Sequence, residues 1–160
     1  MFISDMGAIL RPTHGFNSAS NFPFRDGAPS MYEGSIRVPA IFRWPGKIKA
    51  GVASKAVLTH LDVLPMYLNA AGVLTPKDRI LDGRDQLAAL NGDSSPHKFI
   101  VSQLGGAIAL REGRWKMESS AANTPWDLYD LETNAIESFN LAAKRPKDLE
   151  RLVTLHAQWK

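Results

Sequence analysis

The pattern of apolar residues in the last third of the chain is the feature that most constrains its fold. Residues 108–111 and 114–117 are two short runs rich in apolar side chains, and they flank Glu112-Gly113. A two-residue turn with glycine at its second position is typical of a β-hairpin. Residues 126–131 then alternate apolar and polar side chains, which predicts a third strand. This part of the chain is therefore expected to form a small antiparallel sheet.

A helix is predicted to follow this sheet at the end of the chain. It begins at Pro146, because proline lacks only an N–H that is unpaired in the first turn of a helix. Its apolar residues fall on one stripe, namely Leu149, Leu152, Val153, His156 and Trp159. A stripe of this kind packs against another element, so we interpret His156 as a packed histidine rather than a metal ligand.

The first hundred residues favour an α/β arrangement. Residues 1–3 and 36–44 have the apolar character of strands, and Pro39 favours a strand start or an edge position for the second. Residues 7–31 are rich in Gly, Pro, Asn and Ser and show no period, which predicts a long loop. Loops of this length tend to be functional.

One helix is predicted within this part. Asp62 is placed to cap it, Pro65 lies in its first turn, and Gly72 ends it. The apolar face is expected to be Leu64, Leu68 and Ala71. We therefore expect residues 1–98 to form an incomplete α/β domain and residues 99–160 to form a small subdomain of antiparallel sheet and terminal helix.

The composition excludes several classes of function. The 160 residues contain no cysteine, which excludes disulfide scaffolds, Cys-ligated zinc, iron–sulfur clusters and a thiol nucleophile. The formal net charge is +3, and the basic residues of the first third are scattered singly, unlike the clusters that bind nucleic acid. No apolar run reaches the ~18 residues of a membrane span, and no signal peptide is visible.

Few residues indicate chemistry by themselves. The chain has no Gly-rich phosphate loop, no His-Glu-x-x-His and no nucleophile elbow. Asp5 follows the first predicted strand, and the carboxyl end of a parallel strand faces the crevice where open α/β sheets bind ligands. Its carboxylate suits Ca²⁺ or Mg²⁺, although aspartate is also common in such turns for conformational reasons.

Two further positions are candidates for ligand contact. His14, in the long loop, is the histidine best placed to touch a substrate. Glu33 lies beside Gly34 and near Arg37. It either contacts a ligand or forms a buried ion pair that holds a loop in place, and we favour the ion pair.

Short motifs occur along almost the whole chain in a fixed order: Ser4-Asp5-Met6-Gly7, Ser20-Asn21-Phe22-Pro23-Phe24-Arg25, Tyr32-Glu33-Gly34-Ser35-Ile36-Arg37-Val38-Pro39, Arg43-Trp44-Pro45-Gly46, His60-Leu61-Asp62-Val63-Leu64-Pro65, Leu81-Asp82-Gly83-Arg84-Asp85, Gly113-Arg114-Trp115-Lys116, and Leu128-Tyr129-Asp130-Leu131 followed by Asn140-Leu141-Ala142. In this order they resemble the C-terminal portion of the sulfatase family, which includes arylsulfatases and N-acetylgalactosamine-6-sulfatases. Each motif is a weak signal, but together they are a strong one.

The resemblance implies an alkaline-phosphatase-like α/β fold with a small C-terminal antiparallel sheet and a terminal helix. It also implies hydrolysis of sulfuric esters, of sulfated carbohydrates or aryl sulfates, with a bound Ca²⁺. The family's nucleophile is a formylglycine made from the Cys or Ser of an upstream Cys/Ser-x-Pro-x-Arg motif. In such a site the cation and nearby basic groups stabilise charge on the sulfuryl oxygens.

The chain departs from the family pattern at the positions that would carry this chemistry. Neither a cysteine nor a Ser-x-Pro-x-Arg motif is present, and the family's first pair of metal-binding aspartates would lie upstream of Met1. Met6 stands where the family has a metal-ligating Asn, and a thioether is a poor ligand for Ca²⁺. Ala28 replaces the sulfate-contacting Lys, so Asp5 is the metal ligand that remains. We therefore expect this chain alone not to bind Ca²⁺ tightly.

Three interpretations of function follow. The chain is the C-terminal fragment of a sulfuric ester hydrolase, inactive by itself and produced by a truncated, split or internally started gene. Alternatively it is a non-catalytic, sulfatase-like module that binds a sulfated glycan or a partner chain, which the changes at Met6 and Ala28 favour. The third interpretation is a decayed reading frame without a selected function.

The incomplete α/β part also predicts partners and a location. Missing neighbours would leave apolar surface and a strand edge uncovered, so the expected partners are the missing N-terminal half or a second copy of the chain. The resemblance implies a periplasmic, secreted or lysosomal location.

Overall fold

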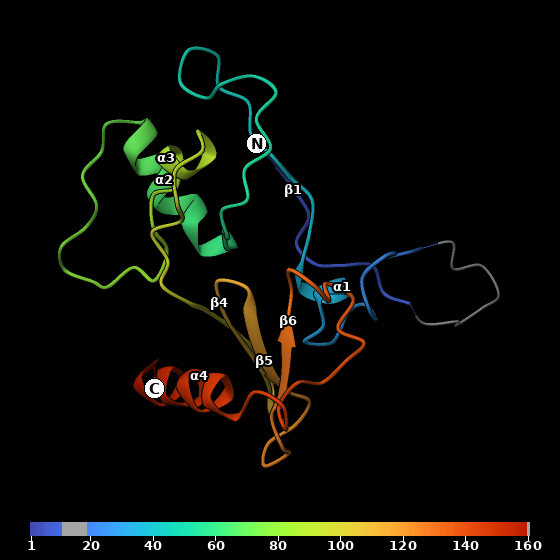
Figure 1. The fold of residues 1–160 in the computed structure, drawn as a ribbon. Helices are drawn as coiled ribbons and strands as arrows, with labels where there is room; N and C mark the ends of the chain where they lie inside the picture. Colours follow the sequence, from blue (N-terminus) through green and yellow to red (C-terminus); the bar gives the residue numbers. More distant parts are fainter. Residues whose placement is uncertain (11–18, 160) are drawn as a thin grey trace. The chain divides into compact units, whose positions relative to one another are not determined.

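The computed structural model describes residues 1–10 and 19–159 (Figure 1). Two compact units are present. Unit 1 comprises Met1–Ile3 and Ala40–Lys98, and unit 2 comprises Ser4–Pro39 and Phe99–Lys160. The expected division into residues 1–98 and 99–160 stays a prediction, because it concerns the domains of a whole enzyme.

Unit 2 is built on a four-stranded antiparallel sheet in the order β3-β4-β5-β6. The strands are β3 (Ile100–Leu104), β4 (Ala107–Glu112), β5 (Trp115–Ser119) and β6 (Asp127–Asp130). The predicted sheet is thereby confirmed, with β3 as an additional strand. The predicted hairpin turn is shifted by one residue, because Glu112 pairs with Trp115 and leaves Gly113-Arg114 as the turn. Gly113 has a φ of 56°, a conformation that favours glycine.

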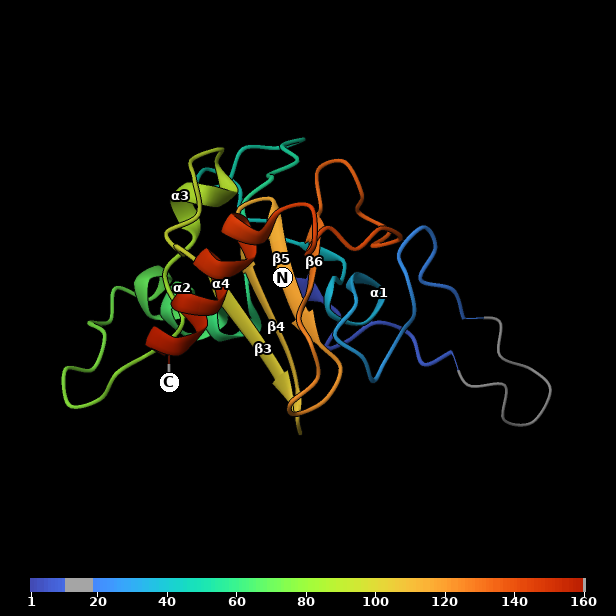
Figure 2. The same ribbon diagram turned by 60° about the horizontal axis from the view of Figure 1, so that its bottom comes forward.

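One face of this sheet is apolar and is covered by the terminal helix, α4 (Pro146–Trp159). Leu110, Met117 and Leu128 lie in register on neighbouring strands and are fully buried. They form a core with Leu152 and Leu155 of α4, and Figure 2 shows the helix lying across the sheet. The predicted helix is confirmed.

The opposite face of the sheet is polar, because side chains alternate along each strand. Lys116 pairs with Arg111 on one side and with Tyr129 on the other, and Glu118 pairs with Asp127. The segment that contains the short helix α1 (Glu33–Ile36) packs against this face through Glu33. Unit 2 therefore has an apolar core on one side of its sheet and a charged, buried layer on the other.

The predicted strand over residues 36–44 is mostly wrong. The chain forms α1 up to Ile36, and Arg37 donates its backbone N–H to the carbonyl of Glu33. Only β2 (Ala40–Ile41) is a strand, directly after Pro39, which cannot donate to a ladder. β2 pairs antiparallel with β1 (Phe2–Ile3), so the parallel strand expected before Asp5 is not observed among the described residues.

Unit 1 also contains a 3-10 turn, η1 (His60–Asp62), and two helices, α2 (Val63–Ala70) and α3 (Leu87–Leu90). α2 confirms the predicted helix, and Gly72 follows it with a φ of 67°. Its expected apolar face is not buried, however: Leu64 is 53% exposed, and Pro65 is the buried residue of the helix. Among the described residues, no helix combines the length and apolar character that a membrane crossing requires.

Candidate functional site

The segment that holds the predicted metal ligand is a tight turn at the start of unit 2. The Asp5 carboxylate accepts a hydrogen bond from the backbone N–H of Met6 at 2.9 Å, and the Ser4 hydroxyl donates to the carbonyl of Met6. Gly7 donates its N–H to the carbonyl of Ser35 at 2.7 Å. A side chain at Gly7 would meet the backbone of Gly34, so this close approach requires glycine.

Asn21 joins the next part of this segment to the loop that contains Ala28. Its side-chain oxygen accepts from the N–H of Ala8, and its amide nitrogen donates to the carbonyls of Ala8 and Asp26. Ala28 then donates its own N–H to the carbonyl of Ala8 at 3.2 Å. The segment that carries Asp5 and Met6 therefore adjoins the loop that carries Ala28.

These residues do not fit a calcium ion by themselves. Asp5 and Met6 are both exposed, and one Asp5 oxygen accepts the N–H of Met6. The described residues contain no group of three or more His, Cys, Asp or Glu side chains that could hold a metal. Calcium requires about six to eight oxygen ligands, so this segment could at most supply part of such a site.

His14 lies outside the described residues, and the other histidines have separate surroundings. His156 is buried on α4, with its ring 5.4 Å from that of Trp126 in an edge-on arrangement, which confirms its interpretation as a packed residue. His60 is exposed in η1.

Glu33 lies at the centre of a buried charge cluster on the polar face of the sheet of unit 2. The Lys116 ammonium is 3.1 Å from one Glu33 oxygen and 2.6 Å from a Glu137 oxygen. The other Glu137 oxygen accepts the backbone N–H of Glu33 at 2.6 Å. Arg37, the partner expected from the sequence, is 3.7 Å from the second Glu33 oxygen, so the ion-pair interpretation of Glu33 is confirmed with Lys116 as an additional partner.

Glu118 and two tyrosines extend this cluster. The side chain of Tyr32 interacts with Glu118, and burial is the main cause that raises the pKa of each. Tyr129 donates its hydroxyl to Asp127 at 3.1 Å, and burial likewise raises its pKa. The Arg25 guanidinium lies over the ring of Tyr32 and donates to the carbonyl of Glu137.

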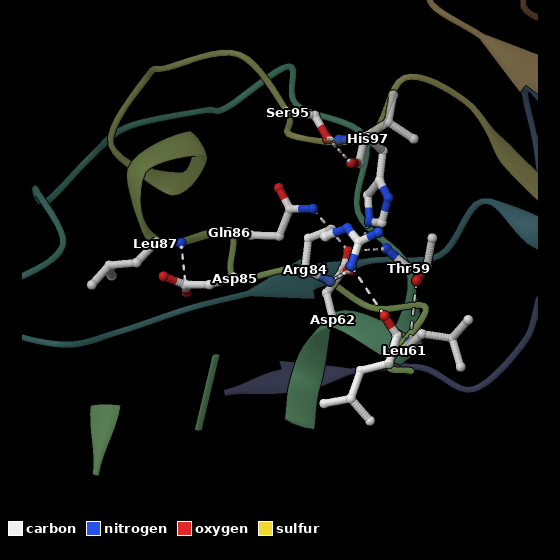
Figure 3. Close-up of polar contacts among 11 residues, drawn as sticks. Thr59, Leu61, Asp62, Arg84, Asp85, Gln86, Leu87, Ser95 and His97 are labelled. Carbon is white, nitrogen blue, oxygen red and sulfur yellow. Dashed lines mark hydrogen bonds and ion pairs between the residues drawn. The ribbon is translucent and has the colours of Figure 1, made fainter. Parts of the chain in front are cut away.

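Asp62 is the centre of a second buried polar network, which lies in unit 1 (Figure 3). One carboxylate oxygen accepts the backbone N–H of Arg84 at 2.8 Å and contacts His97 Nε2 at 2.6 Å. The other accepts from the backbone N–H of Thr59 and the side-chain amide of Gln86. Asp62 is 1% exposed. Its carboxylate is shared by three segments of the chain, which contain Thr59, residues 84–86 and His97.

The role predicted for Asp62 is therefore corrected. Its side chain makes no capping bond to α2, whereas Thr59 and Asp62 form a capping box around η1. Gly83 allows the two segments to approach closely. A Cβ atom at this position would lie 1.9 Å from the carbonyl oxygen of Leu61, so only glycine fits. The motifs that contain Asp62 and Gly83 are thus two halves of one structural junction.

Sequence reasoning missed Lys116, Glu118, Glu137 and His97 as members of these networks. The signal was present for Lys116, which lies between apolar residues on the strand predicted over residues 114–117, whereas Glu118 lies just beyond that strand. The alternation of apolar and polar residues predicts which side chains share a face of the sheet, but it does not predict which segment covers that face. The partners of Lys116 are supplied by segments 83 residues earlier in the chain and about 20 residues later.

Comparison with known proteins places the chain. A family profile described as "N-sulphoglucosamine sulphohydrolase, C-terminal" matches residues 28–104. Human steryl-sulfatase is 34% identical over 126 residues, which is 76% of this chain and 21% of that protein. Mouse N-acetylgalactosamine-6-sulfatase is 31% identical over 160 residues, which is 98% of this chain and 28% of that protein. The chain thus spans about a quarter of the length of the curated relatives that it matches.

Solved structures give the same result. The structure of Ps i-CgsB superposes with a TM-score of 0.85 at 28% identity, covering 99% of this chain and 35% of that one. A complex of that protein with k-i-k-neocarrahexaose gives a TM-score of 0.84. A structure described in complex with its substrate D-glucosamine-2-N,6-O-disulfate has a TM-score of 0.67 at 24% identity, which is a likeness of fold alone. The fold is that of the alkaline-phosphatase-like sulfatases, and the chain belongs to the sulfatase family, carrying sequence that corresponds to its C-terminal part.

Proposed function

We propose that this chain supplies the C-terminal part of a sulfuric ester hydrolase, and that its 160 residues do not hydrolyse a sulfate ester by themselves. The proposal is supported by two observations taken together: the chain belongs to the sulfatase family, and its residues at positions 6 and 28 are Met and Ala. Neither a thioether nor a methyl group can hold Ca²⁺ or neutralise a sulfate. The nucleophile motif of the family is also absent from these residues.

The proposed substrate class is sulfated carbohydrate. Its support comes from the relatives: one is named as acting at the 6-sulfate of N-acetylgalactosamine, and one structural neighbour was solved with a carrageenan oligosaccharide. The segment of Asp5, Met6 and Ala28 would then line the part of the pocket that faces the sulfate. In this arrangement the chain would position one carboxylate, from Asp5, toward a metal whose other ligands lie elsewhere.

Turnover of a chromogenic aryl sulfate tests the proposal directly. The purified 160-residue chain should give no turnover above the rate of buffer, with or without Ca²⁺. Co-expression with the remainder of a related sulfatase, carrying its formylglycine motif, is the matched positive arm. Turnover by the isolated chain would contradict the proposal.

A second function is favoured by the same two substitutions. A module that binds a sulfated glycan or a partner chain without hydrolysis needs neither a metal-ligating Asn at position 6 nor a Lys at position 28. Calorimetric titration with a carrageenan oligosaccharide, and with its desulfated form as the control, distinguishes the two functions. Sulfate-dependent binding without turnover would support the second function, and absence of binding would exclude it for this glycan.

A further inference from the structure

The buried charge cluster of unit 2 has more acidic than basic groups. Its fully buried members are Lys116, Glu33, Glu118 and Glu137, which are at most 2% exposed. One ammonium therefore faces three carboxyl groups in a region from which water is excluded. Like charges held this close in a medium of low polarity do not all stay ionised.

The contacts within the cluster show where charge is poorly compensated. Lys116 forms close contacts with Glu33 and Glu137, at 3.1 and 2.6 Å. The second oxygen of Glu33 is buried and has no hydrogen-bond partner among the described residues. Glu118 interacts with the Tyr32 hydroxyl, and Glu137 and Asp127 are further acidic groups that repel its negative charge.

The remaining charged groups around the cluster do not change this imbalance at Glu118. Arg37 and Arg111 form ion pairs with the second oxygen of Glu33, at 3.7 and 3.9 Å, and neither side chain is fully buried. Arg25 lies over the Tyr32 ring and is directed to the carbonyl of Glu137. On β6, Tyr129 donates its hydroxyl to Asp127.

We propose that this cluster binds a proton when the solution becomes mildly acidic, and that unit 2 is consequently more stable at mildly acidic pH than at neutral pH. The proton would reside on Glu118 or on Glu137. It would remove one of the buried negative charges and give that carboxyl group a hydroxyl that can donate a hydrogen bond within the cluster.

The direction of the effect follows from the thermodynamic linkage between proton binding and folding. Burial is the main cause that raises the pKa of both Glu118 and Glu137 above the ordinary glutamate value, and Lys116 opposes it. A carboxyl group whose pKa is higher in the folded state binds its proton more tightly there. Stability from such groups is fully present below the ordinary pKa of glutamate and is lost as pH rises through the raised values. The gain therefore occurs on going from neutral pH toward that ordinary value.

The ionisation of Asp130 affects stability in the opposite direction, but it does so at lower pH. The Arg114 guanidinium lowers the pKa of Asp130, so stability from this pair is lost only in stronger acid. Between pH 7.5 and 5.5 the glutamate effect is thus separated from the loss of that ion pair.

Amide hydrogen exchange of the full chain tests the proposal within unit 2. The backbone amides of β5 report its opening, after correction for the intrinsic dependence of exchange on pH. In the unsubstituted chain, protection should rise about fivefold between pH 7.5 and 5.5. Glu118→Gln should raise protection at pH 7.5 and reduce the pH dependence. Glu150→Gln, at an exposed position on α4, is the matched control and should follow the unsubstituted chain.

A measurement without substitution keeps the proposal testable if Glu118→Gln does not fold. Carbon-13 labelling of the glutamate carboxyl groups allows each of them to be titrated by NMR. At least one resonance should titrate at distinctly higher pH than the exposed glutamates. The proposal is wrong if all glutamates titrate together in the ordinary acidic range, or if protection of β5 falls between pH 7.5 and 5.5.

Discussion

At the scale of single residues, Asp62 is the clearest case in which the residue type indicated the start of a helix but did not reveal what the side chain binds. An aspartate before a helix is expected to cap it, and the helix does begin directly after Asp62, as predicted. Its carboxylate instead serves the backbone N–H groups of Thr59 and Arg84 and the side chains of Gln86 and His97. Three of these four partners lie 22 to 35 residues further along the chain, at distances over which no local pattern operates.

Replacement of Asp62 by alanine should therefore destabilise unit 1 strongly. Several buried donors would lose their acceptor, and each unsatisfied buried group costs about 1–3 kcal/mol. We expect a total loss of about 3 kcal/mol or more in the free energy of unfolding, measured by urea titration.

Asp93→Asn is the control for this substitution, because Asp93 is exposed and, among the described residues, its side chain is not a member of the network of Figure 3. It should change the free energy of unfolding by no more than about 0.5 kcal/mol. Equal effects of Asp62→Ala and Asp93→Asn would show that the network does not stabilise the fold.

At the scale of elements, the turns and periodic segments were predictable and the connections were not. The hairpin and α4 were predicted because a turn sequence and a helical stripe are local signals. The strand predicted over residues 36–44 was wrong, because apolar content around Pro39 does not distinguish a strand from a short helical turn followed by a loop. Tertiary contacts of Glu33 decided between them.

The core between α4 and the sheet gives a second testable expectation. Leu152 is fully buried against Leu110, Met117 and Leu128. Leu152→Ala should lower the free energy of unfolding by about 2–5 kcal/mol, because the cavity it leaves is only partly refilled. Glu150→Ala, on an exposed part of the same helix, should cost less than about 0.5 kcal/mol. Unfolding followed by tryptophan fluorescence measures both, since Trp115 and Trp126 pack against this core.

The junction at Gly83 gives a third expectation, on backbone packing. Gly83→Ala would place a Cβ 1.9 Å from the carbonyl of Leu61, so the two segments must separate. Gly113→Ala provides the comparison, since Gly113 has a positive φ but open space around it. We expect Gly113→Ala to lower the free energy of unfolding by about 1 kcal/mol. Gly83→Ala should lower it clearly more, as measured by thermal unfolding. The reverse order would contradict the packing of this junction.

At the scale of the whole molecule, the family could be recognised but the site could not be completed. Motifs spread over nearly all of the chain gave the sulfatase family, and the comparisons confirmed it. That Met6 and Ala28 stand at positions of the family's site stays a prediction, while Asn21 and Ala8 join the segments that carry them. The chain nevertheless covers about a third of the structure of Ps i-CgsB.

Calcium gives the prediction that belongs to this scale. Asp5 alone offers too few oxygen atoms, so addition of Ca²⁺ should leave the melting temperature of the chain unchanged. Differential scanning calorimetry with and without millimolar Ca²⁺ measures this, with Mg²⁺ as the matched control. An increase of several degrees that is specific to Ca²⁺ would show that the chain assembles a metal site of its own.

The sequence by itself determined the family, the antiparallel sheet and the terminal helix. These follow from local period, turn chemistry and residue identity, which need no knowledge of the fold. Only the tertiary structure decided what the buried polar residues do. Asp62 and Lys116 meet most of their partners far away in the sequence, because a buried charge is stable only where the fold brings its counterparts to it.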